Sequence, residues 1–151
     1  MTTSYSFLNL PTATDLGQII AIYRAQGWWF VDRDAPEIAE GIIRGSHCFA
    51  TARDNGRIVG MGRAISDGVS DAYIQDVAVL EPFRNTGIGG RLIACIVERL
   101  RADGLDWIGL IAEPGSHRFY QRLGFFPLQD AQPMLWNPDH EFRRTDNSHK
   151  S

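Results

Sequence analysis

The chain has 151 residues, of which 44% are hydrophobic and 22% are charged, and its formal net charge is -3 at pH 7. These values are typical of one soluble globular domain that is large enough to bury a hydrophobic core. The slightly acidic balance, with no dense run among the 15 lysines and arginines, argues against nucleic acid as a partner.

The N-terminal residues and the two cysteines indicate the cellular compartment in which the protein is expected. The first residues, MTTSYSFLNLP, lack a charged segment followed by a long apolar core, so we expect no signal peptide. No apolar stretch approaches the roughly 18 residues that a membrane-spanning helix needs. Cys48 and Cys95 each lie inside an apolar run, which favours reduced core residues over a disulfide. We therefore predict a cytoplasmic protein with no membrane contact.

The first part of the chain predicts one strand and two helices. The strand covers residues 5–10 and ends before a proline. Thr14 or Asp15 can cap the first helix, whose apolar residues recur at helical spacing until Gly27 ends it. The second helix covers residues 36–44 and begins with a proline, a residue that suits the first turn.

The pattern then changes to short alternating runs. Asn55-Gly56 separates two of these runs and is a strong signal for a β-hairpin. Apolar residues after the third run recur on one helical face. The predicted elements of this part are strands at 47–53, 57–65 and 72–80 and a helix at 89–102.

The last part predicts a central strand at 107–112, a short helix at 115–123 and a final strand at 134–136. The order of all these elements indicates one α/β domain with a mixed sheet, spanning residues 1–137. Residues 138–151 read as a polar, mobile tail.

The segment RNTGIGG, residues 84–90, lies between a predicted strand and a predicted helix. Such a loop offers unpaired N–H groups at the positive end of a helix dipole, which is a natural anion site. A tight turn is the plain structural alternative. A P-loop would need Lys-Ser/Thr after the glycines, where this chain has Arg91-Leu92. A dinucleotide fingerprint would need a third glycine in the place of Leu92.

The remaining pattern, Arg84-x-x-Gly87-x-Gly89 after a strand, resembles motif A of the GNAT superfamily of N-acetyltransferases. A second segment, FYQRLGF at 119–125, is similar to the FYxxLGF segment of that family. The element order also matches over nearly the whole chain. The resemblance implies an α/β GNAT fold, with a mixed, mostly antiparallel sheet flanked by about four helices.

The resemblance also implies acetyl-CoA as the cofactor. In the family, loop amides bind the pyrophosphate, and the strand before the loop pairs with the pantetheine arm and aims one N–H at the thioester. The implied cofactor-binding residues are Val77, Ala78, Val79, Arg84, Asn85, Thr86, Gly87, Ile88, Gly89, Gly90, Arg91, Phe119 and Tyr120.

Acetyl transfer to an amine needs a proton donor for the leaving thiolate and a proton acceptor for the amine. Tyr120 matches the tyrosine that many family members use as the acid; simple packing is the alternative. Asp76, a carboxylate inside an apolar strand, is one candidate base, with a structural role as its alternative. Glu113 is the other candidate, or else a helix cap. The reaction requires no metal, and the histidines show no ligand spacing.

Aromatic residues predict the acceptor side. Trp28 and Trp29, between the first two helices, could line an apolar amine pocket with Tyr73 and Trp136, where cation–π contact is available. Packing of both tryptophans between the first helix and the sheet is the alternative. Several stretches resemble plastid-type members related to serotonin acetyltransferases, although Gln75 stands where those carry a tryptophan.

We expect a small-molecule amine as the substrate. A protein lysine or N-terminus is the rival acceptor, and a non-catalytic acyl-CoA sensor is the rival class. Because family members often dimerise, a homodimer is also expected.

Overall fold

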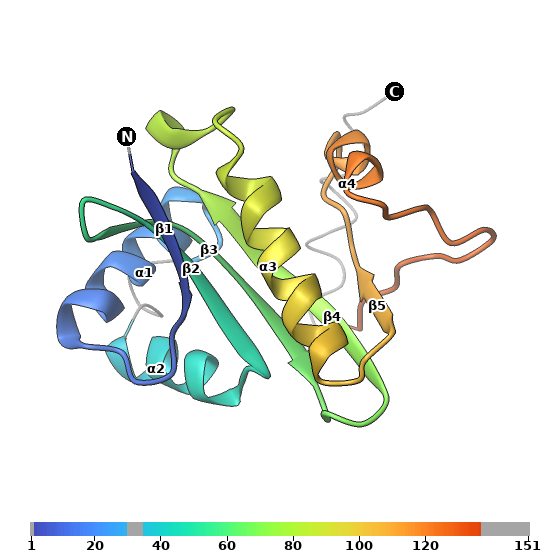
Figure 1. Ribbon diagram of the computed structural model, residues 1–151, viewed down its shortest axis with the longest axis horizontal. Helices are drawn as coiled ribbons and strands as arrows, with labels where there is room; N and C mark the ends of the chain where they lie inside the picture. Colours follow the sequence, from blue (N-terminus) through green and yellow to red (C-terminus); the bar gives the residue numbers. More distant parts are fainter. Residues whose placement is uncertain (1, 30–34, 137–151) are drawn as a thin grey trace.

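A mixed five-stranded sheet forms the centre of the computed structural model, which describes residues 2–29 and 35–136 (Figure 1). The strands lie in chain order, β1-β2-β3-β4-β5; neighbouring strands are antiparallel except β4 and β5, which are parallel. The strands are β1 (Thr3–Phe7), β2 (Cys48–Asp54), β3 (Arg57–Ser66), β4 (Asp71–Val79) and β5 (Trp107–Leu110). The helices are α1 (Ala13–Ala25), α2 (Pro36–Gly45), α3 (Ile88–Ala102) and α4 (His117–Arg122), with a 3₁₀ turn, η1, at Glu81–Phe83. This confirms the predicted α/β class and the mostly antiparallel sheet.

Local sequence explains where several of these elements begin. The Thr12 hydroxyl accepts from the Asp15 N–H at 3.1 Å, and the Asp15 carboxylate accepts from the Thr12 N–H at 3.0 Å. This capping box starts α1. Asn55 and Gly56 both have positive φ, as the two-residue turn between β2 and β3 requires.

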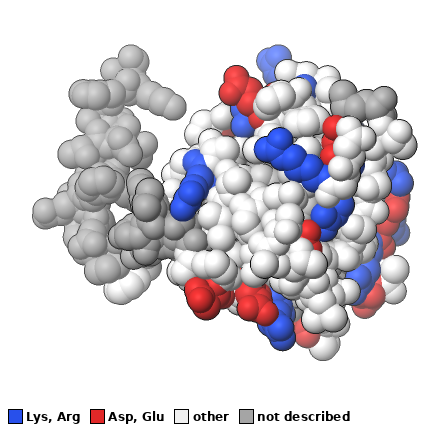
Figure 2. Space-filling view, turned by 90° about the vertical axis from the view of Figure 1, so that its left-hand side faces the viewer, with Lys and Arg blue, Asp and Glu red and all other residues white. Residues whose placement is uncertain are grey.

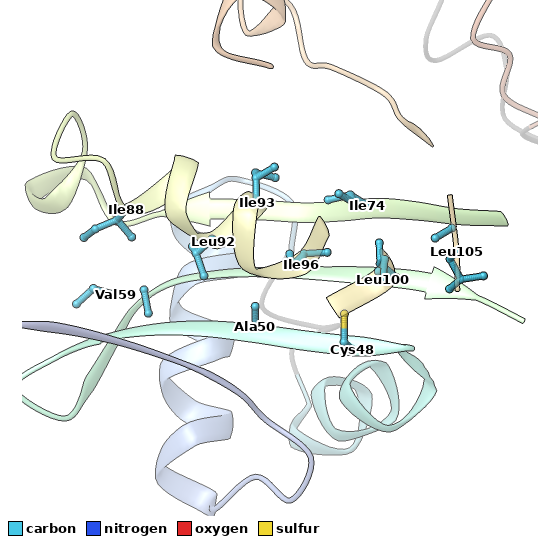
Figure 3. Close-up of a cluster of buried hydrophobic side chains, with 13 residues drawn as sticks. Cys48, Ala50, Val59, Ile74, Ile88, Leu92, Ile93, Ile96, Leu100 and Leu105 are labelled. Atoms are coloured by element: carbon cyan, nitrogen blue, oxygen red, sulfur yellow. The ribbon is translucent and has the colours of Figure 1, made fainter. Parts of the chain in front are cut away.

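The two faces of the sheet are covered by different helices (Figure 1). On one face, Ile88, Leu92, Ile96 and Leu100 of α3 lie in a row over the strands (Figure 3). On the other face, α1 and α2 bury a second apolar cluster that includes Tyr23. The sheet therefore lies between two layers of helices. The β4–β5 junction, where the pairing of these two strands ends, remains available for a site.

The structure corrects several predicted boundaries. The first strand is Thr3–Phe7 rather than residues 5–10, because its pairing with β2 ends at Phe7 and Ala50. The strand predicted at 107–112 stops at Leu110, where its pairing with β4 ends. The short helix begins at His117, because Gly115 has a φ of 84° and cannot be its first residue.

The predicted strand at Met134–Trp136 is wrong. These residues have no strand assignment, and Met134 and Trp136 are 89% and 87% exposed. A segment with strand-like residues becomes a strand only when a neighbouring strand pairs with it, and the sheet places none beside this one. The predicted tail, residues 138–151, lies outside the described residues.

The surface carries charges of both signs. Arginines and carboxylates are interspersed on the face shown in Figure 2. Across residues 2–29 and 35–136, no helix is both long and apolar enough to cross a membrane.

Candidate functional site

A groove opens where β4 and β5 diverge. Their parallel pairing runs from Asp71 and Trp107 to Ile74 and Leu110, after which β4 continues to Val79 with β3 as its only neighbouring strand. In Figure 1, β5 leads away from β4 toward α4. The resulting β4–β5 groove has a volume of about 820 Å³ and extends from β4 to the start of α3 and to α4. The end of β4 thus presents an unpaired edge to a cavity.

A bulge in β4 faces this groove. Met61 pairs with Ala78 and Arg63 pairs with Gln75, so Asp76 and Val77 have no pairing partner on β3. Asp76 adopts a left-handed φ of 55°, which is unusual for a residue other than glycine. A bulge of this kind changes the direction of the strand and of its backbone groups.

The glycine loop closes one end of the groove. Its side chains stabilise the turn itself: Arg84 Nε donates to the Val79 carbonyl at 2.9 Å, and Thr86 Oγ1 donates to the Phe83 carbonyl at 2.6 Å. The backbone N–H groups from Asn85 to Gly90 donate no hydrogen bond within the described part of the chain. The loop therefore presents consecutive N–H donors at the N-terminus of the 15-residue helix α3, an arrangement suited to phosphate.

Tyr120, on α4, lies in the wall of the groove. Its ring packs edge-on against Phe119 and Phe125, with ring centres 5.0 Å and 5.9 Å away. Its hydroxyl makes no hydrogen bond to any described residue. Burial, and secondarily the charge of Glu113, raises the pKa of this phenol, so it keeps its proton at neutral pH.

The two candidate bases have different surroundings. Asp76 Oδ2 accepts from Tyr23 Oη at 2.8 Å and from Arg63 Nε at 2.6 Å. The side chain of Glu113 is exposed and makes no hydrogen bond or ion pair to the described residues. Its backbone carbonyl instead accepts from Ser116. Both carboxylates line the groove, but only that of Glu113 has no hydrogen-bonding partner there.

The aromatic residues separate into two groups. Trp28 lines both the groove and an adjoining cavity of about 390 Å³, whose wall also includes Tyr73. Trp29 instead stacks on Tyr23, with ring centres 4.1 Å apart and planes 10° apart. Trp136 borders neither cavity. Sequence spacing places Trp28 and Trp29 in the same loop, but only their packing distinguishes a lining residue from a supporting one.

The groove thus brings together most of the expected site residues. Those that line it are Trp28, Asp76, Val77, Ala78, Val79, Arg84, Asn85, Gly87, Ile88, Gly89, Gly90, Glu113, Phe119 and Tyr120. Those outside its lining are Thr86, Arg91, Trp29 and Trp136, while Tyr73 lines the adjoining cavity.

The groove has further lining residues that were not predicted from the sequence. Arg122 lies within the second motif, and its charge beside the glycine loop was a usable signal for a phosphate ligand. Gln26, at the end of α1, carries no such signal, because only the folded chain brings it to the groove. Over the described residues, no three or more His, Cys, Asp or Glu side chains are grouped as metal ligands would be.

The element order, the splayed strands and the amide-lined loop define the acyl-CoA N-acyltransferase fold. The model of the acetyltransferase (GNAT) family matches residues 16–125. The chain belongs to this family.

Relatives and solved structures agree with this assignment. The N-acetyltransferase ycf52 of Pyropia yezoensis is 36% identical over 85 residues, 56% of this chain and 49% of that protein. The chloroplastic serotonin N-acetyltransferase 2 of Oryza sativa subsp. japonica is 40% identical over 76 residues, 50% of this chain and 38% of that protein. The match to these curated relatives spans about half of their length or less. A GNAT-family acetyltransferase of Streptococcus pneumoniae shares the fold with a TM-score of 0.75 at 24% identity, over 90% of this chain and 98% of that one.

Proposed function

We propose that this protein transfers an acetyl group from acetyl-CoA to a primary amine of a small molecule, by direct attack when both are bound. The observation that carries the proposal is the β4–β5 groove, which joins a phosphate-suited loop at one end to a protonated phenol on its wall. Membership of the GNAT family supports the same chemistry.

The residues fit coenzyme A in shape and charge. The N–H groups from Asn85 to Gly90 would hold the pyrophosphate, with Arg84 and Arg122 adding positive charge nearby. At residues 77–79, the edge of β4 that β5 no longer covers would hydrogen-bond the extended pantetheine arm in place of a neighbouring strand. The bulge at Asp76 would turn a backbone N–H toward the thioester oxygen, where it polarises the carbonyl.

Proton transfer falls to residues on the β5 side of the groove. The amine must lose a proton for its nitrogen to attack, and Glu113, directly or through water, can accept it. A C–N bond forms and the C–S bond breaks, so negative charge develops on sulfur. Tyr120 would give its phenolic proton to that sulfur, and its raised pKa keeps the proton available until then. The second proton, which the attached nitrogen loses as the amide forms, would pass through water to the Tyr120 oxygen and restore the phenol.

The acceptor side favours an apolar or aromatic amine. The wall of the adjoining cavity includes Trp28 and Tyr73 together with Asp76 and Glu113, so it combines aromatic faces with two carboxylates. Such a wall attracts a cation carried on an apolar body. The resemblance to a relative named serotonin N-acetyltransferase supports an arylalkylamine among the candidates.

The test is thiol release from acetyl-CoA by the purified protein, measured over a panel of amines. We expect release with arylalkylamines such as tryptamine, and weaker release with polyamines and with a lysine-containing peptide. Faster turnover of the peptide would instead favour a protein acetyltransferase. Binding of acetyl-CoA without thiol release for any acceptor would support a sensor domain and overturn the proposed activity.

A further inference from the structure

Three side chains from different elements meet behind the bulge of β4. The Tyr23 hydroxyl of α1 and the Arg63 guanidinium of β3 both donate to Oδ2 of Asp76, at 2.8 Å and 2.6 Å. Tyr23 is fully buried, and the Arg63 side chain is only 14% exposed. The carboxylate of Asp76 is therefore held at one position by two donors that approach from the helical layer and from the neighbouring strand.

The backbone at this point needs such support. A left-handed φ is uncommon outside glycine, and aspartate adopts it where hydrogen bonds hold its short polar side chain. On the other side of the bulge, a Cβ added at Gly62 would lie 3.3 Å from Val77 Cγ2 and 3.0 Å from Ile96 Cδ1. Val77 is thus pressed closely against β3, while the side chain before it is bonded to Tyr23 and Arg63.

The tyrosine is itself fixed in place. The Trp29 ring stacks on the Tyr23 ring with ring centres 4.1 Å apart, and the Trp28 ring is tilted against it with ring centres 6.1 Å apart. These contacts give Trp29 a role although it does not line the groove. A continuous line of contacts then leads from the loop after α1, through Tyr23, to the strand edge that faces the groove.

We propose that Tyr23 and Arg63 are positioning residues that hold the Asp76 carboxylate and so keep the Val77 N–H directed at the thioester oxygen. This proposal rests on the proposed acetyl transfer. In it, Asp76 anchors the bulge and is not the base, because its carboxylate is already bonded to Tyr23 and Arg63, whereas the exposed carboxylate of Glu113 has no such partner among the described residues. Glu113 retains the role of proton acceptor.

The first measurement follows the Val77 amide by NMR with acetyl-CoA and with CoA. We expect a downfield shift of the Val77 amide proton that is larger with acetyl-CoA than with CoA, since only the thioester offers the acceptor oxygen. In Tyr23→Phe, which loses only the hydroxyl, this difference should fall to less than about half of the wild-type value. An unchanged difference would overturn the proposal.

The second measurement compares kinetic constants and pH profiles. Tyr23→Phe and Arg63→Gln should lower kcat by roughly tenfold, with the KM for acetyl-CoA changed less than about twofold, because the cofactor is bound mainly by the loop. Asp76→Asn should keep the acidic limb of the kcat/KM profile where the wild type has it, whereas Glu113→Gln should abolish that limb. Loss of the limb in Asp76→Asn would make Asp76 the base and overturn the proposal.

Matched controls separate positioning from general damage. Tyr5→Phe removes a hydroxyl on β1, and Arg53→Gln breaks a comparable ion pair with Asp15, 3.0 Å long. Neither should change kcat or the Val77 shift. If no amine releases thiol in the wild type, the proposed activity fails, while the NMR comparison of acetyl-CoA with CoA still tests the positioning role.

Discussion

At the scale of single residues, the surroundings of each side chain assign its role more firmly than its identity does. Asp76 and Glu113 are both carboxylates at the groove, yet two donors occupy the first and no described residue bonds the second. The two tryptophans of one loop divide in the same way, since Trp28 lines the groove and Trp29 supports Tyr23. Residue type alone therefore could not separate acting from supporting groups.

Tyr120→Phe tests the proposed role of Tyr120 as proton donor. We expect kcat to fall about 100-fold, because the departing thiolate would lose its acid, while the Kd for acetyl-CoA changes little. Steady-state thiol release measures kcat, and calorimetric titration measures the Kd for acetyl-CoA. Tyr5→Phe, far from the groove on β1, is the matched control and should keep the wild-type kcat. Equal turnover by Tyr120→Phe and the wild type would remove Tyr120 as the acid.

At the scale of elements, caps and turns connect local sequence to stability. Asp15 lies in the capping box of α1 and also accepts from Arg53 at 3.0 Å. Burial raises the pKa of this carboxyl, but hydrogen bonds from Thr12 and Arg53 together outweigh that effect and hold it below its ordinary value of 3.8. The unfolded chain therefore takes up this proton before the folded chain does.

This linkage gives a stability prediction. The contribution of Asp15 is fully present above the ordinary value of 3.8 and is lost as the pH falls through the lowered value. Asp15→Asn should cost about 1–2 kcal/mol at pH 7, and the gap to the wild type should close toward pH 2.5. Urea unfolding of both proteins at several pH values from 7 down to 2.5 measures the difference in their free energies of unfolding. Glu37→Gln, at an exposed first-turn position of α2, should cost less than about 0.5 kcal/mol. A gap that stays constant with pH would refute the assigned linkage.

At the scale of the whole molecule, two layers of helices hold the sheet, and the divergence of β4 from β5 forms the groove. The ligand that fits this groove should stabilise the folded chain by mass action. At about 100 times its Kd, acetyl-CoA should add about 2.7 kcal/mol and raise Tm by roughly 5–10 °C. ATP and NAD should give smaller shifts, because neither has a pantetheine arm to pair with β4.

A variant of the loop sharpens this experiment. Asn85→Asp places a carboxylate beside the expected pyrophosphate and should reduce the shift caused by acetyl-CoA, without lowering the Tm of the protein alone. Asn55→Asp is a close control, since Asn55 also has a positive φ but lies in the distant β2–β3 turn. Equal acetyl-CoA shifts in both variants, or a larger shift with NAD, would contradict the proposed ligand.

The sequence by itself determined what depends on local patterns. The β2–β3 hairpin follows from Asn55-Gly56, and α3 follows from helical spacing after a glycine loop. The two motifs at 84–89 and 119–125 were sufficient to indicate the family, which the family model confirms. Arg91 and Leu92 alone show that the loop matches neither the P-loop nor the dinucleotide fingerprint.

Only the tertiary structure decided which groups meet. The strand predicted at Met134–Trp136 does not form, because pairing depends on a neighbour that local sequence cannot specify. The contact of Asp76 with Tyr23 joins residues 53 positions apart, and no spacing rule predicts it. Local patterns specify elements, whereas long-range packing specifies the divergence of β4 from β5 and the bulge that directs the site.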